Sequence, residues 1–146
     1  MRTPWFVKGY LGVGKTVNSD SSIPLVRART VSFTTRMTFD ANADTDVTVK
    51  VYYSPDGNNW DTIVFTSWTI TFTASTTVQR TCILDIPEHG YLRIAIYNGS
   101  QAQTLSAISV WYTIQSWEGV EAVAGLYPYE LKGKKERREE TGQLVI

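Results

Sequence analysis

The sequence of 146 residues has very few of the side chains that catalysis and disulfide chemistry need. Cys82 is its only cysteine, so no intrachain disulfide can form, which fits a reducing compartment. His89 is its only histidine, so there is no second imidazole for a catalytic dyad or a histidine-rich metal site. We therefore predict no catalytic residues, no cofactor, no metal site and a protein that is not an enzyme.

The sequence also lacks a net charge and a long apolar run. Acidic and basic residues balance at 14 each, so no overall charge attracts nucleic acid or an anionic membrane. The N-terminal residues have no apolar stretch of signal-peptide length, and no run approaches the roughly 20 apolar residues of a membrane-spanning helix. These absences predict a cytoplasmic protein whose partners are neither nucleic acid nor membrane.

What the sequence does contain is threonine in alternating stretches. In residues 67–73, Trp68, Ile70 and Phe72 fall on one face and threonines on the other. A period of two residues is typical of a strand with one buried and one wet face. The same alternation recurs in residues 31–39, 47–53, 77–86, 92–96 and 104–116.

Turn-forming residues separate these stretches, at residues 40–46, 55–57, 87–90 and 98–99. No window of ten or more residues before position 117 has a helical period. We predict an all-β fold of about eight strands, an antiparallel, jelly-roll-like β-sandwich over residues 1–117 that includes a glycine-rich N-terminal segment. Residues 118–146 are predicted to be an extended C-terminal arm or tail.

Residues 9–16, GYLGVGKT, match the phosphate-binding P-loop pattern letter for letter. That loop needs a helix after the final threonine, because the helix N-terminus cradles the phosphates. Here Thr16 is followed by turn formers that end at Pro24. We expect a glycine-rich strand or N-terminal arm at this position, and no nucleotide site.

Residues 40–46, DANADTD, place side-chain oxygens at alternate positions, as calcium loops do. An EF-hand loop needs glycine at its sixth position and glutamate at its twelfth, but those positions hold Thr45 and Val51. The segment is therefore expected to be a polar hairpin loop between two strands, with a looser calcium site as the alternative.

Residues 52–60, YYSPDGNNW, contain a turn motif. Pro55 and Asp56 suit the early positions of a turn and Gly57 the later one, and Trp60 is expected to begin the next strand. The S-x-D-G-x-x-W pattern resembles a turn of discoidin-like sandwich domains and of many phage structural proteins. It is also similar to the Asp-box of sialidase propellers, with one residue fewer between aspartate and glycine. The resemblance implies that the motif pins a hairpin and that Trp60 is structural, with a ligand platform as the alternative.

A second segment, residues 90–98, GYLRIAIYN, resembles the Y-v-R-i-x-i-x-N strand that discoidin-like domains carry late in the chain. The paired N- and C-terminal cysteines of secreted discoidin domains are absent here. The resemblance therefore points to the fold more than to an extracellular lectin role.

Two functions fit these features. The first is a non-enzymatic virion structural protein, a capsid decoration or tail-associated protein, assembled in the host cytoplasm. It would act through protein–protein contacts, as a homo-oligomer with a trimer favoured, and with other virion proteins as partners. Apolar residues near both ends are its candidate contacts: Trp5, Phe6, Leu126, Tyr127, Tyr129 and Leu131.

The second function is a carbohydrate-binding β-sandwich module. Exposed aromatic rings give such a module a platform on which sugar rings stack. The candidate platform residues are Trp60 and Tyr52, to which Trp111 and Tyr112 could add.

Overall fold

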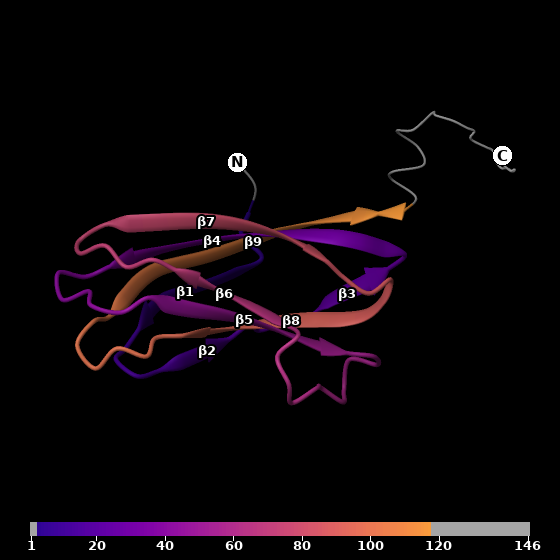
Figure 1. Ribbon diagram of the computed structural model, residues 1–146, viewed down its shortest axis with the longest axis horizontal. Coiled ribbons are helices and arrows are strands. Elements are labelled where there is room, and N and C mark those ends of the chain that lie inside the picture. Colours follow the sequence, from indigo (N-terminus) through magenta and orange to yellow (C-terminus); the bar gives the residue numbers. More distant parts are fainter. Residues whose placement is uncertain (1–2, 118–146) are drawn as a thin grey trace, which may run out of the picture. The chain divides into compact units, whose positions relative to one another are not determined.

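The computed structural model describes residues 3–117, which form strands joined by turns and loops (Figure 1). Within these residues, no helix has the length and hydropathy needed to cross a membrane. The nine strands of the described part of the chain are β1 (Phe6–Leu11), β2 (Thr16–Asn18), β3 (Ile23–Val26), β4 (Ala28–Phe39), β5 (Val47–Ser54), β6 (Thr66–Ile70), β7 (Thr77–Asp85), β8 (His89–Tyr97) and β9 (Leu105–Ser116).

The strands form two sheets. One sheet has the order β1-β9-β4-β7, and the other has the order β2-β8-β5-β6, with β3 also paired to β8. β1 pairs antiparallel with β9, and β8 pairs antiparallel with β2 and with β5. The chain crosses from one sheet to the other after β1, β3, β4, β6, β7 and β8, and such repeated crossing is typical of a jelly roll. The predicted all-β, jelly-roll-like sandwich is therefore confirmed.

The described residues divide into two compact units. The larger unit holds residues 3–25, 32–84 and 89–113. Within it, β4, β7 and β9 lie in one layer and β2, β5 and β8 in the other (Figure 1).

The smaller unit holds residues 26–31, 85–88 and 114–117 of the described chain. In it, the Trp117 backbone N–H donates to the Arg27 carbonyl at 3.0 Å. The Arg29 guanidinium carbon lies 5.0 Å from the centre of the Trp117 ring.

The core of the sandwich comes from the inward-facing positions of the alternating strands. On β4, residues 31, 33, 35, 37 and 39 are all buried, as the period-two pattern predicts. Val47, Val49 and Val51 of β5 are fully buried, and so are Leu92 and Ile96 of β8. One of these inward positions is polar, since Thr35 is buried and its hydroxyl has no hydrogen-bond partner among the described residues.

Some strand boundaries differ from the prediction. β6 ends at Ile70, and Phe72, expected on its apolar face, is 40% exposed. Its backbone N–H donates to Asp46 Oδ1 at 3.1 Å, a side-chain acceptor outside any strand pairing. Trp60 does not begin a strand, because β6 starts at Thr66.

The N-terminal aromatic residues belong to the sandwich. Phe6 is buried in β1, and its ring centre lies 6.4 Å from that of Trp5. Trp5 also packs edge-on against Tyr112 at 5.5 Å and lies 6.4 Å from the ring of Phe33. Its indole N–H donates to Ser21 Oγ at 3.0 Å. Both residues, predicted as contacts for a neighbouring subunit, thus have packing partners within this chain.

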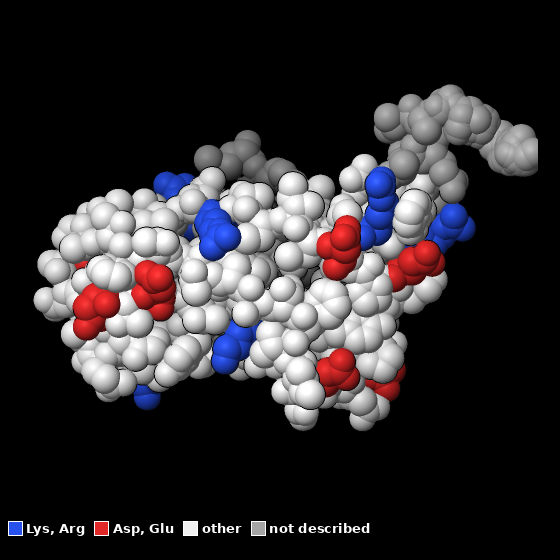
Figure 2. All heavy atoms as spheres, in the orientation of Figure 1, with Lys and Arg blue, Asp and Glu red and all other residues white. Residues whose placement is uncertain are grey.

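Charged side chains are scattered over the face shown in Figure 2, with uncharged residues between them. That distribution agrees with the balanced composition. The face shows no broad patch of a single charge that would attract a polyanion.

Candidate functional site

The loop that follows β5 is held together by its own hydrogen bonds. Ser54, the last residue of β5, is fully buried. Its hydroxyl accepts the N–H of Gly57 at 2.8 Å and lies 2.9 Å from the carbonyl of Asn59, to which it can donate. Gly57 has a φ of +83°, a backbone conformation that favours glycine. The serine and glycine of the motif are therefore both needed by the turn.

The Asp56 carboxylate closes the same loop from the outside. It accepts the backbone N–H groups of Asn59 and Asn58, each at 2.8 Å, and the Asn59 side-chain amide at 2.6 Å. These hydrogen bonds, with that from the Asn59 backbone the largest, lower the pKa of Asp56 well below its ordinary value of 3.8. The loop is thus a turn held by hydrogen bonds among its own residues, and these bonds fix the position of Trp60, which follows it directly.

Trp60 lies over the side chain of a residue in β8. The guanidinium carbon of Arg93 is 4.4 Å from the centre of the Trp60 ring. Arg93 is paired across the sheet with Tyr52 of β5, so these three side chains lie close together. Cation–π attraction of this kind holds the indole and the guanidinium against each other.

Next to this cluster lies a second cation–aromatic pair. Lys50 of β5 is paired with Ala95 of β8, and its ammonium nitrogen is 5.6 Å from the centre of the Tyr97 ring. Ala95 also pairs with Asn18 of β2. The side chain of Ala95 is only a methyl group, so it leaves space between Asn18 and Lys50, and all three residues line the same hollow of the sheet face.

Together these residues form a groove of about 480 Å³ across β2, β8 and β5. That size lies within the range of about 300–1,000 Å³ that is usual for small-molecule sites. Two cations and one carboxylate, Lys50, Arg93 and Asp61, line it, and neither cation forms an ion pair with a carboxylate within residues 3–117. The lining residues are Thr16, Asn18, Lys50, Tyr52, Trp60, Asp61, Thr62, Arg93, Ala95 and Tyr97.

The four aromatic residues predicted as one platform are divided between the two sheets. Trp60 and Tyr52 line the groove on the five-stranded sheet. Trp111 and Tyr112 belong to β9 of the four-stranded sheet, where they line a different recess. Arg93, Lys50 and Tyr97 were not among the predicted site residues, because their partners become visible only through the pairing of β8 with β5.

The P-loop-like segment is a strand, a turn and a second strand. β1 ends at Leu11, and Gly14, with a φ of +64°, donates its N–H to the Ser100 carbonyl at 2.9 Å. Thr16 begins β2, so no helix follows it, as predicted. Without that helix, the segment lacks the helix N-terminus whose backbone N–H groups bind phosphate in a P-loop.

The loop of residues 40–46 connects strands of different sheets, so the predicted hairpin is wrong. Its carboxylates are used in hydrogen bonds: Asp40 Oδ2 accepts the N–H and the hydroxyl of Thr104 at 3.0 and 2.9 Å. The bond from the Thr104 backbone is the largest cause of the lowered pKa of Asp40. Within residues 3–117 no group of three or more His, Cys, Asp or Glu side chains is placed to hold a metal ion.

Two further residues also have structural positions. His89, expected in a turn, begins β8, and its carbonyl accepts the Tyr53 hydroxyl at 2.7 Å. Cys82 is half-buried on β7. The candidate contacts Leu126, Tyr127, Tyr129 and Leu131 lie outside the described residues, as does the whole predicted arm of residues 118–146.

By its strand order the protein is a jelly-roll β-sandwich. No protein-family model matches its sequence, and no curated protein matches it significantly. One solved structure that it resembles is described as "Family 16 Carbohydrate Binding Module-2". The two are 18% identical with a TM-score of 0.45, over 69% of this chain and 73% of the other. At that identity and TM-score the likeness carries no functional information.

Proposed function

We propose that the protein binds carbohydrate in the groove on the outer face of its five-stranded sheet. The observation that carries this proposal is the arrangement of Trp60. Its ring lies against Arg93 at the side of an open groove, and a self-bonded loop fixes its position. An aromatic ring held in advance loses little conformational entropy when a ligand stacks on it.

The groove has the mixed chemistry that a sugar requires. A pyranose ring has apolar C–H faces, which pack on aromatic rings, and a rim of hydroxyl groups, which need hydrogen-bond partners. Trp60, Tyr52 and Tyr97 supply aromatic surface, and Asn18 and Asp61 supply polar groups at its edges. A purely apolar ligand would leave those polar groups without partners, which disfavours a lipid.

The openness of a sheet face also favours a chain-like ligand over a small compact one. The groove crosses three neighbouring strands, so successive residues of a polysaccharide could contact β2, β8 and β5 in turn. We therefore expect affinity to rise with the length of the oligosaccharide until the groove is filled.

Affinity gel electrophoresis on a panel of neutral and uronate-containing polysaccharides tests the proposal. We expect at least one polysaccharide to retard the protein, and Trp60→Ala to weaken that retardation at least tenfold. Trp60→Phe should retain part of it, because a smaller aromatic ring remains. Trp117→Ala, which removes an exposed tryptophan of the smaller unit, is the matched control and should bind normally. Binding that is unchanged in Trp60→Ala would exclude the groove as the site.

The virion structural role stays a prediction. Four of its six candidate contacts lie outside the described residues, and Trp5 and Phe6 pack within the sandwich. The predictions of a trimer, of virion partners, of a virion or cytoplasmic location and of a non-enzyme likewise stay predictions. Light scattering on the purified protein would measure the oligomeric state.

A further inference from the structure

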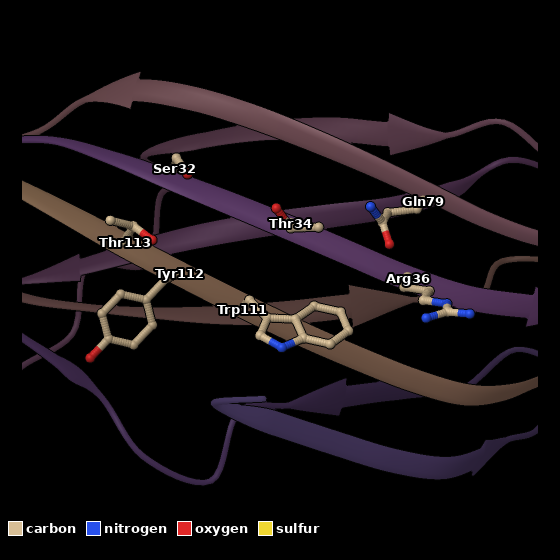
Figure 3. A pocket seen from close by; sticks show the side chains of 7 residues that line it. All are labelled: Ser32, Thr34, Arg36, Gln79, Trp111, Tyr112 and Thr113. Carbon is tan, nitrogen blue, oxygen red and sulfur yellow. The ribbon is translucent and has the colours of Figure 1, made fainter. Parts of the chain in front are cut away.

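A second recess lies on the outer face of the other sheet. It has a volume of about 260 Å³ and is formed by β4, β7 and β9 of the larger unit (Figure 3). None of its lining residues belongs to the groove described above. Its floor carries hydroxyl groups, including that of Thr34, which is hydrogen-bonded to the hydroxyl of Thr81 at 2.8 Å across β4 and β7.

The indole of Trp111 is the aromatic surface of this recess. Figure 3 shows the ring face-on, with its six-membered part directed toward Arg36, while the Tyr112 ring extends away on the other side. Trp111 is half-buried on β9.

Two planar polar side chains stand beside the indole. Arg36 of β4 and Gln79 of β7 are both exposed, and neither forms a hydrogen bond or an ion pair with another of the described residues. A guanidinium and an amide present several N–H donors, and the amide also presents an acceptor. Such groups can bind pairs of neighbouring hydroxyls while the indole packs against a C–H face.

We propose that this recess is a second carbohydrate site, with room for a shorter stretch of sugar than the groove. The proposal takes its ligand class from the proposed function, but it is carried by different residues on a different sheet. The outer faces of the two sheets of a sandwich point in opposite directions. One short oligosaccharide cannot reach both sites, so each chain binds two ligands and can bridge two polysaccharide strands.

Isothermal titration calorimetry measures the number of sites. The probe is a short oligosaccharide cut from a polysaccharide that retards the wild-type protein in the affinity gel. We expect two molecules bound per chain, one in Trp111→Ala, one in Trp60→Ala and none in the double variant. Ile83→Ala, which removes an exposed apolar side chain of β7 outside the recess, is the matched control and should keep both.

Turbidity of a long polysaccharide measures bridging. The wild-type protein should precipitate the polymer, and each single variant should bind it without precipitating it. An oligomer with one site per chain would behave differently, because Trp111→Ala would still precipitate the polymer.

Three outcomes would contradict the proposal. If the wild-type protein binds one ligand per chain, and that binding is lost in Trp60→Ala and kept in Trp111→Ala, the proposed second site is refuted and the proposed groove is supported. Unchanged stoichiometry and precipitation in Trp111→Ala has the same meaning. If the wild-type protein binds none of the polysaccharides, both proposed sites are refuted. If Trp111→Ala fails to fold, the double substitution of Arg36 and Gln79 by alanine replaces it, since both side chains are exposed and should lower the affinity of this site alone at least fivefold.

Discussion

The buried hydroxyl of Ser54 connects the stability of the sandwich to the position of Trp60. Replacing it by alanine leaves the Gly57 N–H and the Asn59 carbonyl without their partner at 2.8 and 2.9 Å. Each such hydrogen bond contributes about 0.5–1.5 kcal/mol net, so Ser54→Ala should lower the free energy of unfolding by about 1–3 kcal/mol. For a domain of this size that corresponds to a fall in Tm of roughly 4–12 °C.

Urea unfolding followed by tryptophan fluorescence measures this change in free energy. Ser67→Ala is the matched control, because Ser67 is an exposed serine on the neighbouring strand β6. A substitution at an exposed position of this kind changes stability by less than about 0.5 kcal/mol. The slope of the transition should be the same in both variants, since neither changes the surface buried on folding.

The same variant should weaken carbohydrate binding although Ser54 does not line the groove. Without the hydroxyl, the loop that places Trp60 over Arg93 has more conformations, and the ligand must select one of them. We expect a loss of affinity of several-fold, with Ser67→Ala unaffected. A Ser54→Ala protein as stable as the control would refute the account of the loop, and undiminished affinity in a destabilised protein would separate loop order from binding.

Three further outcomes follow from single contacts. Gly90→Ala should lower the free energy of unfolding by about 2–4 kcal/mol in a urea titration, because φ is +112° there and the new Cβ would lie 2.6 Å from Tyr53 Cζ; Tyr53→Phe, which loses only a hydrogen bond, should cost about 1 kcal/mol. Thr35→Val should raise the free energy of unfolding by about 1 kcal/mol, and with it Tm, because it removes a buried hydroxyl that lacks a partner within residues 3–117. An unchanged or lower Tm would indicate that the hydroxyl is satisfied. The lowered pKa of Asp56 contributes stability that is fully present above pH 3.8 and is lost as the pH falls through its folded-state pKa, so acid titrations followed by circular dichroism should show a shallower decline in Asp56→Asn than in the wild type.

The long strands of the sandwich were predictable because their alternation continues over many residues. On β4, five alternate positions are buried, and the pattern cannot be satisfied by a helix. On β5 and β8 the same period gave the buried face correctly. The turn at residues 54–57 was also predictable, because a positive φ is needed at Gly57 and glycine supplies it.

The shorter strands and the sites were not predictable in the same way. β2 and β3 have three and four residues, too few to establish a period. The groove depends on which strands are neighbours, and Arg93 meets Trp60 only because β8 pairs with β5. Four aromatic residues look alike in a sequence, whereas the strand order assigns Trp60 and Trp111 to different sheets.

The strand order also determines when the protein can fold during its synthesis. β9 lies between β1 and β4, and β8 lies between β2 and β5, so each sheet has a gap at its centre until β8 and β9 have been synthesised. Neighbours that are distant in sequence make folding slow, because a long loop must close before the contact is gained. While β9 is inside the ribosome, the emerged strands have unpaired edges and an uncovered apolar face, and they need protection from aggregation until Ser116 has left the exit tunnel.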